Sequence, residues 1–232
     1  ILPKLLGSLS SAFQLGHEQV FVSASIGVTI YPDDGTEIET LLKNADQALY
    51  AAKGAGRNRF SYFTPALQEA SLLRAQLTHD LRAALAGQEF RVVYQPIVEL
   101  ATGRIHKAEA LLRWQHPTRG LVSPVEFIPV AETSGLIVDI GEWVFAQAMH
   151  QVKIWRARLD PNFQISVNKS PVQFENPNPK HPPWIDQLRA DGLDGTSVAV
   201  EITEGLLLSS SAGVAQQLLM LRNEGIQVSL DD

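Results

Sequence analysis

The spacing of apolar residues divides the chain into a short first part and a longer second part. The first part alternates between segments with helical periodicity and segments rich in β-branched residues, one of which is interrupted by Gly27. Such a unit is small for an independent hydrophobic core. Its predicted elements are a helix over residues 2–15, a strand over 20–31, a turn over 32–35, a helix that starts at 37 and stops at the glycines of 53–56, and an edge strand over 59–63.

The second part opens with a helical pattern over residues 65–86 and continues with two strands, over 90–98 and 105–113. A short loop containing Thr102 and Gly103 joins these strands, and so few residues permit only an antiparallel hairpin. The rhythm then changes to long helices that alternate with short strands, which predicts right-handed crossovers and a parallel sheet or barrel. The predicted helices cover 124–134, 137–158, 184–191 and 212–224, and the predicted strands cover 164–168, 197–203 and 227–231.

The predicted α/β organisation has three segments. Residues 1–64 form the first domain part, residues 65–86 form a linking helix, and residues 87–232 form the start of a larger domain. We count about five strands in this larger domain, whereas a (β/α)8 barrel needs eight. We therefore expect an open sheet with an unpaired parallel edge at 227–231.

Each strand of the second part carries a polar group on one of its faces. In the hairpin, Glu109 shares a face with Leu111 and Arg113, while the residues between them are apolar. The later strands have an apolar face for the helices and a face of small residues that ends in a carboxylate or an amide. In a barrel these second faces point inward, and their carboxyl ends form the mouth. We therefore expect convergence of Glu109, Asn168, Glu201 and Asp231, with Asp232 close behind.

Such a set of oxygen ligands, without cysteine or histidine, suits Mg²⁺ or Mn²⁺ better than Zn²⁺. Several carboxylates a few Å apart also need cations, because they cannot otherwise all stay ionised. If the chain turns after Asp231, then Asp231 and Asp232 together can hold two metal ions ~4 Å apart, the arrangement used in phosphoester hydrolysis. The plainer interpretation is that each acid forms an ordinary salt bridge.

The composition of the chain limits the classes of partner that it is expected to bind. The chain has 232 residues, a formal net charge of −6 and 45% hydrophobic residues, and no basic cluster. This argues against a nucleic-acid polymer or a membrane surface as partner, whereas a small anion held through metal ions is compatible with it. The absence of cysteine fits a reducing cytoplasm. Because the chain starts with Ile1, we expect a fragment of a longer protein, which upstream domains could tether to a membrane.

Two motifs of the first part carry a family resemblance. S-I-G-V-T-I-Y-P-D-D-G and A-D-Q-A-L-Y-A-A-K-G-A-G-R-N-R-F are similar to the C-terminal part of a GGDEF domain, the diguanylate cyclase module. In that family the positions of Lys53 and Arg57 contact nucleotide phosphates; the plainer interpretation is two solvated cations near a helix C-terminus. The resemblance implies that the signature loop precedes Ile1, so we expect no cyclase activity from this stretch.

The second part resembles an EAL domain, the cyclic di-GMP phosphodiesterase module. The motifs are Y-Q-P-I-V at Tyr94, E-A-L-L-R-W at Glu109, P-V-E-F-I-P-V-A-E-T-S-G-L-I at Pro124, S-V-N-K-S-P at Ser166, E-I-T-E at Glu201 and the final Asp231-Asp232. The resemblance implies a TIM-barrel-like fold whose first strand is antiparallel to the others, here truncated after about five strands. It also implies metal-dependent hydrolysis of cyclic di-GMP to 5′-pGpG in bacterial signalling.

Carried over by position, the resemblance assigns roles to individual residues. Glu109, Asn168, Glu201 and Asp231 would be metal ligands, and Asp232 would serve the second metal. Gln95 and Arg113 would hold the nucleotide and phosphate parts of the substrate, and Arg suits phosphate because its planar fork donates two hydrogen bonds. Glu204 would anchor the loop after Asp232, or equally be a helix N-terminal acid without a role.

Other functions stay open. We expect the parent protein to be a phosphodiesterase, while this stretch by itself is inactive because later strands would complete the site. One alternative is a catalytically inert domain that binds cyclic di-GMP and signals without cleaving it. Another is a regulatory or dimerisation module, with a homodimer as its assembly. His106 and His116 lack a second histidine at ligand spacing, and we interpret both as incidental.

Overall fold

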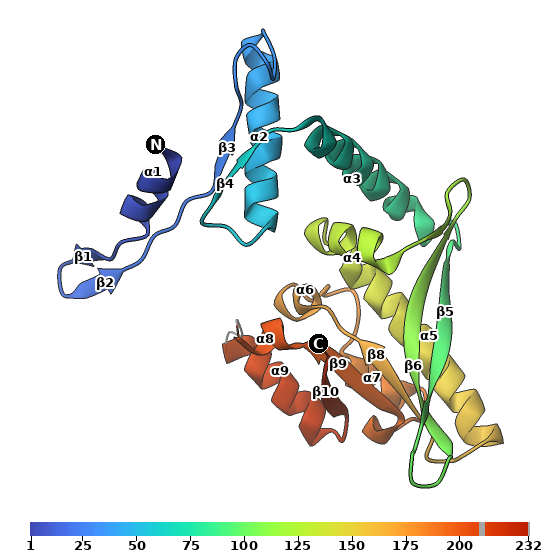
Figure 1. The fold of residues 1–232 in the computed structure, drawn as a ribbon. Coiled ribbons are helices and arrows are strands. Elements are labelled where there is room, and N and C mark those ends of the chain that lie inside the picture. The colour runs from blue at the N-terminus through green and yellow to red at the C-terminus, as the bar shows by residue number, and fades with distance from the viewer. Residues whose placement is uncertain (209–211, 232) are drawn as a thin grey trace. The chain divides into compact units, whose positions relative to one another are not determined.

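The computed structural model describes residues 1–208 and 212–231. The chain forms two compact units, Ile1–Gln76 and Leu77–Asp232 (Figure 1). The predicted domain boundaries at residues 64 and 86 stay predictions.

The first unit departs from the sequence prediction at its start. The predicted helix over 2–15 is wrong beyond Leu9, because the Ser10 hydroxyl donates to the Leu6 carbonyl at 2.8 Å and the chain then turns back at Gly16, which has φ +62°. The predicted strand over 20–31 shrinks to three residues. The elements are α1 (Leu2–Leu9), β1 (Phe13–Leu15), β2 (Glu18–Val20), β3 (Ile26–Val28), α2 (Ile38–Gly54) and β4 (Phe60–Tyr62).

Close packing of β3 on α2 holds this unit together. β3 pairs in parallel with β4, and Gly27 in its centre faces the helix. A Cβ atom at Gly27 would lie 1.9 Å from the Ala45 carbonyl oxygen, so only glycine fits this approach. Asn44 fixes the preceding turn, because its Nδ2 donates to the Asp34 carbonyl at 2.7 Å.

The second unit is built on one open sheet with the strand order β10-β9-β8-β6-β5, and β7 pairs with β6. The hairpin β5–β6 is antiparallel and the pairs β6–β8, β8–β9 and β9–β10 are parallel, which confirms the predicted topology. The described strands do not close a barrel (Figure 1). The strands are β5 (Phe90–Val98), β6 (Ile105–His116), β7 (Gly120–Val122), β8 (Gln164–Asn168), β9 (Val198–Thr203) and β10 (Gln227–Asp231).

The helices of the second unit follow the predicted periodicity, with two short additions. Neither α6 nor α8 was predicted, because five residues are too few to show a period; a capping box between Ser170 and Gln173 starts α6. None of the described helices is long and apolar enough to span a membrane. The helix α3 (Pro65–Ala84) begins in the first unit and ends in the second. The other helices are α4 (Pro124–Thr133), α5 (Ile137–Arg158), α6 (Pro171–Glu175), α7 (Trp184–Ala190), α8 (Glu204–Leu208) and α9 (Ala212–Asn223).

The core lies on the face of the sheet that the helices cover. Ala108, Ala110 and Trp114 of β6 are buried there, in alternation with Glu109 and its neighbours on the other face. Trp114 is fully buried, and its indole Nε1 donates to Glu89 Oε2 at 2.8 Å, so its one polar group is satisfied. This packing fixes which face of β6 stays free of helices.

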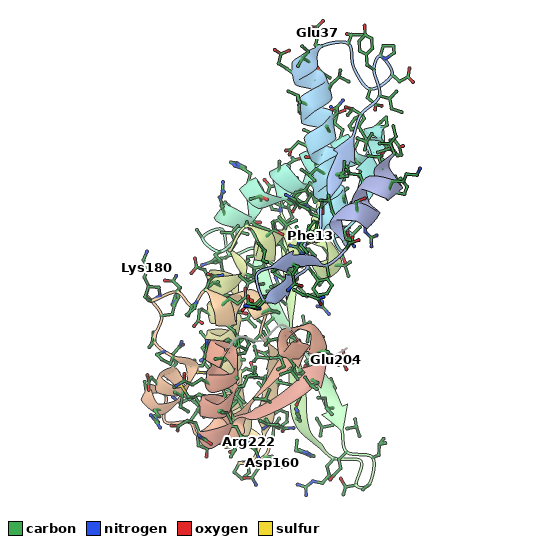
Figure 2. The ribbon with its side chains drawn as sticks, turned by 90° about the vertical axis from the view of Figure 1, so that its left-hand side faces the viewer. Phe13, Glu37, Asp160, Lys180, Glu204 and Arg222 are labelled. Atoms are coloured by element: carbon green, nitrogen blue, oxygen red, sulfur yellow. The ribbon has the colours of Figure 1, made fainter. Side chains whose placement is uncertain are left out.

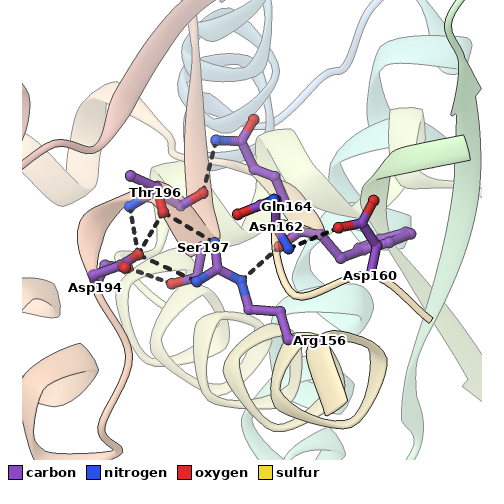
Figure 3. A network of polar contacts seen from close by, with 8 residues as sticks. Arg156, Asp160, Asn162, Gln164, Asp194, Thr196 and Ser197 are labelled. Atoms are coloured by element: carbon purple, nitrogen blue, oxygen red, sulfur yellow. Dashed lines mark hydrogen bonds and ion pairs between the residues drawn. The ribbon is translucent and has the colours of Figure 1, made fainter. Parts of the chain in front are cut away.

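A polar network braces the amino-terminal ends of the strands (Figure 3). Arg156, at the end of α5, donates to the Phe163 carbonyl at 2.8 Å and to Thr196 Oγ1 at 3.0 Å, and it pairs with Asp194 at 3.3 Å. The hydrogen bond from Thr196 and the Arg156 charge hold the pKa of Asp194 below its usual value. The network ties the chain segments that lead into β8 and β9 to one another.

Gly27→Ala tests the packing of the first unit. The added methyl group would meet backbone atoms, so we expect the unfolding free energy of this unit to fall by at least about 2 kcal/mol. Hydrogen exchange of α2 in increasing urea measures this loss. The tryptophans all lie in the second unit, so the midpoint of their fluorescence transition should not move. Gly7→Ala, where a Cβ meets nothing within 4 Å, is the matched control, and equal effects of the two substitutions would contradict the packing described.

Candidate functional site

The predicted acids lie toward the carboxyl ends of the parallel strands. In the register, Glu109 of β6 lies opposite Ser166, Asn168 of β8 lies opposite Glu201, and Asp231 of β10 lies opposite Thr203. Their side chains are on the face that the helices leave free. Figure 2 shows Glu204, which follows β9, at the end of the sheet opposite Asp160. Candidate site and polar network thus occupy opposite ends of the same strands.

Two of the predicted ligands are in direct contact. Asn168 Nδ2 donates to Glu109 Oε1 at 2.8 Å, although the residues are 59 positions apart in the sequence. Gln95 lies directly opposite Glu109 in the β5–β6 hairpin and is exposed. The structure therefore brings the Asn168 amide to the Glu109 carboxylate, and the hairpin register places Gln95 opposite Glu109 on the neighbouring strand.

Glu201 shows the electrostatic character of the site. Burial is the largest cause that raises its pKa above the usual value, and the charges of Glu109 and Asp231 raise it further. The nearby Ser166 hydroxyl and the Lys107 ammonium act in the opposite direction. Glu109, Glu201 and Asp231 are thus close enough for mutual repulsion, which a bound cation would relieve.

A pocket of about 270 Å³ adjoins these residues. Arg113 is half-buried in its wall, and its Nη1 donates to the Leu112 carbonyl at 2.9 Å. A guanidinium has five N–H donors, so several stay available for a ligand. The pocket joins the polar end of the strands to α4 and α5, with walls that include Arg113, Ile128, Glu132, Asn168, Glu201 and Thr203.

The sequence also singled out Asp232, Glu204, Lys53 and Arg57. Asp232 lies outside the described residues. Glu204 is the first residue of α8 and is exposed, and its proposed anchoring role stays a prediction. Lys53 lies in the last turn of α2 and is exposed, as is Arg57, in agreement with the interpretation as solvated cations.

The chemistry of the donor set fits a hard divalent cation. Glu109, Asn168, Glu201 and Asp231 offer only oxygen ligands, and the contact of Asn168 with Glu109 and the raised pKa of Glu201 show that they gather. Within residues 1–208 and 212–231, however, no three His, Cys, Asp or Glu side chains stand together as a ready-made metal site. The proposed ligand set also includes the Asn168 amide, which is not one of these residue types, and Asp232, which lies outside the described residues.

Sequence reasoning missed Lys169, which follows Asn168. Burial lowers the pKa of its ammonium to about 8, while the charge of Glu142 partly opposes the shift. Its Nζ lies 4.6 Å from the ring centre of Phe174 and 4.3 Å from that of Trp184. The sequence holds a signal for this residue, because alternation continued one step past Asn168 places Lys169 on the side of Ile165 and Val167, where a charge is unexpected.

His116 has a structural role. It is buried, and its Nε2 lies 3.2 Å from Asp80 Oδ2. Its Nδ1 accepts from the backbone N–H groups of Thr118 and Arg119, both at 3.2 Å. The ring thus ties the turn between β6 and β7 to α3, away from the acids.

Models of two protein families match the chain. The EAL domain model matches residues 78–232, and the model of the diguanylate cyclase, GGDEF domain, matches residues 1–59. The bifunctional diguanylate cyclase/cyclic di-GMP phosphodiesterase MucR of Pseudomonas aeruginosa is 36% identical over 233 residues, 99% of this chain and 33% of MucR. The cyclic di-GMP phosphodiesterase PdeR of Escherichia coli is 33% identical over 229 residues, 99% of this chain and 34% of PdeR. The chain spans about a third of the length of these curated relatives.

Solved structures show the same fold. A structure of the PaMucR phosphodiesterase in complex with c-di-GMP has a TM-score of 0.60 and 37% identity, over 68% of this chain and 63% of that chain. The EAL enzyme Bd1971, in its cAMP and cyclic-di-GMP bound form, has a TM-score of 0.63 and 27% identity, over 86% of this chain and 52% of that chain. The predicted TIM-barrel-like α/β fold is confirmed by this likeness.

The electrostatic coupling of the site is testable by titration. In metal-free buffer, Glu109→Gln should lower the pKa of Glu201, because it removes a negative charge that raises this pKa. Lys107→Met should raise the same pKa, because it removes a compensating positive charge. Carboxyl ¹³C chemical shifts followed against pH measure both changes. If the pKa of Glu201 in both variants equals that in the unsubstituted chain, Glu201 does not interact with Glu109 or with Lys107.

Proposed function

The chain belongs to the EAL domain family, with a GGDEF-type segment before it, and from this we propose that its parent protein hydrolyses cyclic di-GMP to the linear dinucleotide 5′-pGpG. The observation that carries the proposal is the Glu109–Asn168 contact beside the half-buried Glu201. An all-oxygen site with excess negative charge, next to a pocket with an arginine in its wall, suits a phosphodiester that is bound through cations.

Residues of the chain bind and orient the substrate in this proposal. Arg113 donates to a phosphate oxygen from the wall of the pocket, where partial burial strengthens a charge-assisted hydrogen bond. Gln95, exposed and opposite Glu109, holds a nucleotide part of the substrate. The pocket of about 270 Å³ accommodates only part of a dinucleotide, so the rest lies along the open face of the sheet.

Mg²⁺ or Mn²⁺ is the proposed cofactor. Glu109, Asn168, Glu201 and Asp231 would hold it, and Asp232 would serve a second ion. Bound divalent ions supply positive charge to the phosphate and acidify water for attack. In their absence, burial and the charges of Glu109 and Asp231 raise the pKa of Glu201 above its usual value.

The reaction is an in-line displacement at one phosphorus atom. An oxygen atom of water forms the new bond to phosphorus, the bond to the 3′ oxygen breaks, and that oxygen takes up a proton. The second phosphodiester stays intact, which gives 5′-pGpG. Arg113 stabilises the charge that develops on the phosphate oxygens, and no side chain acts as a covalent nucleophile.

The proposal also covers the GGDEF-type segment, the location and the assembly. Residues 1–59 do not contain the G-G-D-E-F sequence, so we propose no cyclase activity for this stretch. We propose a cytoplasmic location and, as an assembly, a homodimer.

Glu109→Gln tests the catalytic proposal in the full-length protein. Replacement of the carboxylate by an amide removes a charged ligand, so we expect formation of 5′-pGpG in Mn²⁺ to fall by about 100-fold or more. Chromatography of the nucleotides measures the product. Glu126→Gln, at an exposed acid of α4, is the matched control and should keep full activity. Binding of cyclic di-GMP without turnover by the unsubstituted protein would contradict the enzyme and favour the inert receptor.

Arg113→Lys tests the phosphate contact. A lysine keeps the charge but loses the planar fork, so we expect the apparent affinity for cyclic di-GMP to fall about tenfold or more. Isothermal titration in Ca²⁺ measures affinity separately from turnover. Arg158→Lys, at the exposed end of α5, is the control. Equal affinities of the two variants would remove Arg113 from the binding site.

A further inference from the structure

A second pocket of about 420 Å³ lies on the helical side of the second unit. It is formed between α5, α7, α9 and the proline-rich loop before α7. It shares Lys169 and Gln173 with the pocket of the candidate site. Its walls are otherwise largely apolar, with Val138, Pro177, Pro183, Trp184, Met220 and Leu221 among them.

Lys169 supplies a cation to this pocket, and the charge of Glu142 acts on its ammonium from beyond ion-pair distance. Lys169 Nζ lies over the rings of Phe174 and Trp184, and Phe145 stacks on Trp184 with the ring centres 4.0 Å apart. No ion pair joins Lys169 to a carboxylate of the described residues. Aromatic faces attract an ammonium but do not accept its three N–H groups as oxygen atoms do. The ammonium is therefore held in place and left without an acceptor.

A second donor in the same wall is also unused. Gln173 is 4% exposed, and its Oε1 accepts from the Ser170 backbone N–H at 3.0 Å in the capping box of α6. Its Nε2 is buried and has no hydrogen-bond partner in the described part of the chain. A buried N–H group without an acceptor destabilises a folded protein. Its presence here therefore favours a ligand that has a hydrogen-bond acceptor.

The acids in the pocket already have partners. Glu142 accepts from Trp184 Nε1 at 2.9 Å and from Gln187 Nε2 at 3.0 Å. Glu224 pairs with Arg189 at 2.6 Å. Both carboxylates of the pocket thus accept from donors of the chain, whereas Lys169 Nζ and Gln173 Nε2 have no acceptor among the described residues.

We propose that this pocket binds a small monocarboxylate with an apolar body. The two carboxylate oxygens would accept from Lys169 Nζ and Gln173 Nε2, and the apolar body would lie against Trp184 and the prolines. A dianionic phosphate suits the pocket less well, because Lys169 is one cation beside two acids, and His181 already faces Asp139 at 3.4 Å. The proposal does not depend on phosphodiester hydrolysis, since the chain's own pocket residues carry it.

The test is an NMR titration of the full chain with benzoate at pH 7, compared with phenyl phosphate and with the neutral benzamide. We expect benzoate to shift the Trp184 indole N–H signal in a saturable way, with phenyl phosphate and benzamide each about tenfold weaker or more. Lys169→Met keeps the length of the side chain and removes its charge, and it should abolish the benzoate effect. Lys180→Met is the matched control, because Lys180 is exposed in the loop before α7 and its side chain points outward (Figure 2).

A second pair of variants keeps the test decisive if Lys169→Met does not fold. Met220 lines the pocket and is 56% exposed, so a polar substitution there leaves the core intact. Met220→Lys should strengthen benzoate binding and Met220→Glu should weaken it, because the added charges act on a carboxylate with opposite sign. Equal shifts with benzoate and benzamide, or benzoate binding unaffected by these substitutions, would overturn the proposal. Neither outcome depends on cleavage of cyclic di-GMP.

Discussion

Repulsion between carboxylates at the carboxyl ends of the strands is the constraint on which the site depends. The parallel register of β6, β8, β9 and β10 places Glu109, Glu201 and Asp231 on one face of the sheet, where burial and the charges of the other two acids raise the pKa of Glu201. The fold relieves part of this repulsion through the Asn168 hydrogen bond to Glu109 and the charge of Lys107. In the proposed function, a bound divalent cation would relieve the rest of this repulsion and would also bind the phosphate oxygens of the substrate.

Stability and chemistry are separated along the strands. The buried side of the sheet is packed around Trp114, and the amino-terminal ends are braced by Arg156, Asp194 and Thr196. Neither region includes Glu109, Asn168, Glu201 or Asp231. Acids that repel one another can therefore persist at the opposite end, as in barrels whose active sites lie at the carboxyl ends of the strands. Lys169 and Gln173 do not follow this separation, because they line both the pocket of the candidate site and the second pocket on the helical side.

The sequence predicted what depends on local patterns. The period-2 alternation around Glu109 and the long periodic helix of α5 were confirmed, because burial on one face dictates them directly. The hairpin of β1 and β2 was missed, since a positive φ at Gly16 rather than a hydrophobic pattern makes its turn. The Glu109–Asn168 contact was expected from equivalent strand positions, whereas the aromatic surroundings of Lys169 come from α6 and α7 and have no signature in the strand itself.

Paramagnetic broadening by Mn²⁺ tests the central claim, that a cation site lies at the carboxyl ends of these strands, most directly. Substoichiometric Mn²⁺ added to the chain should first broaden the backbone amide signals around Asn168, Glu201 and Asp231, and leave those around Asp160 and Asp194 sharp. The selective broadening should disappear in Glu201→Gln. Broadening spread evenly over the surface acids, or centred on the amino-terminal ends of the strands, would contradict the account.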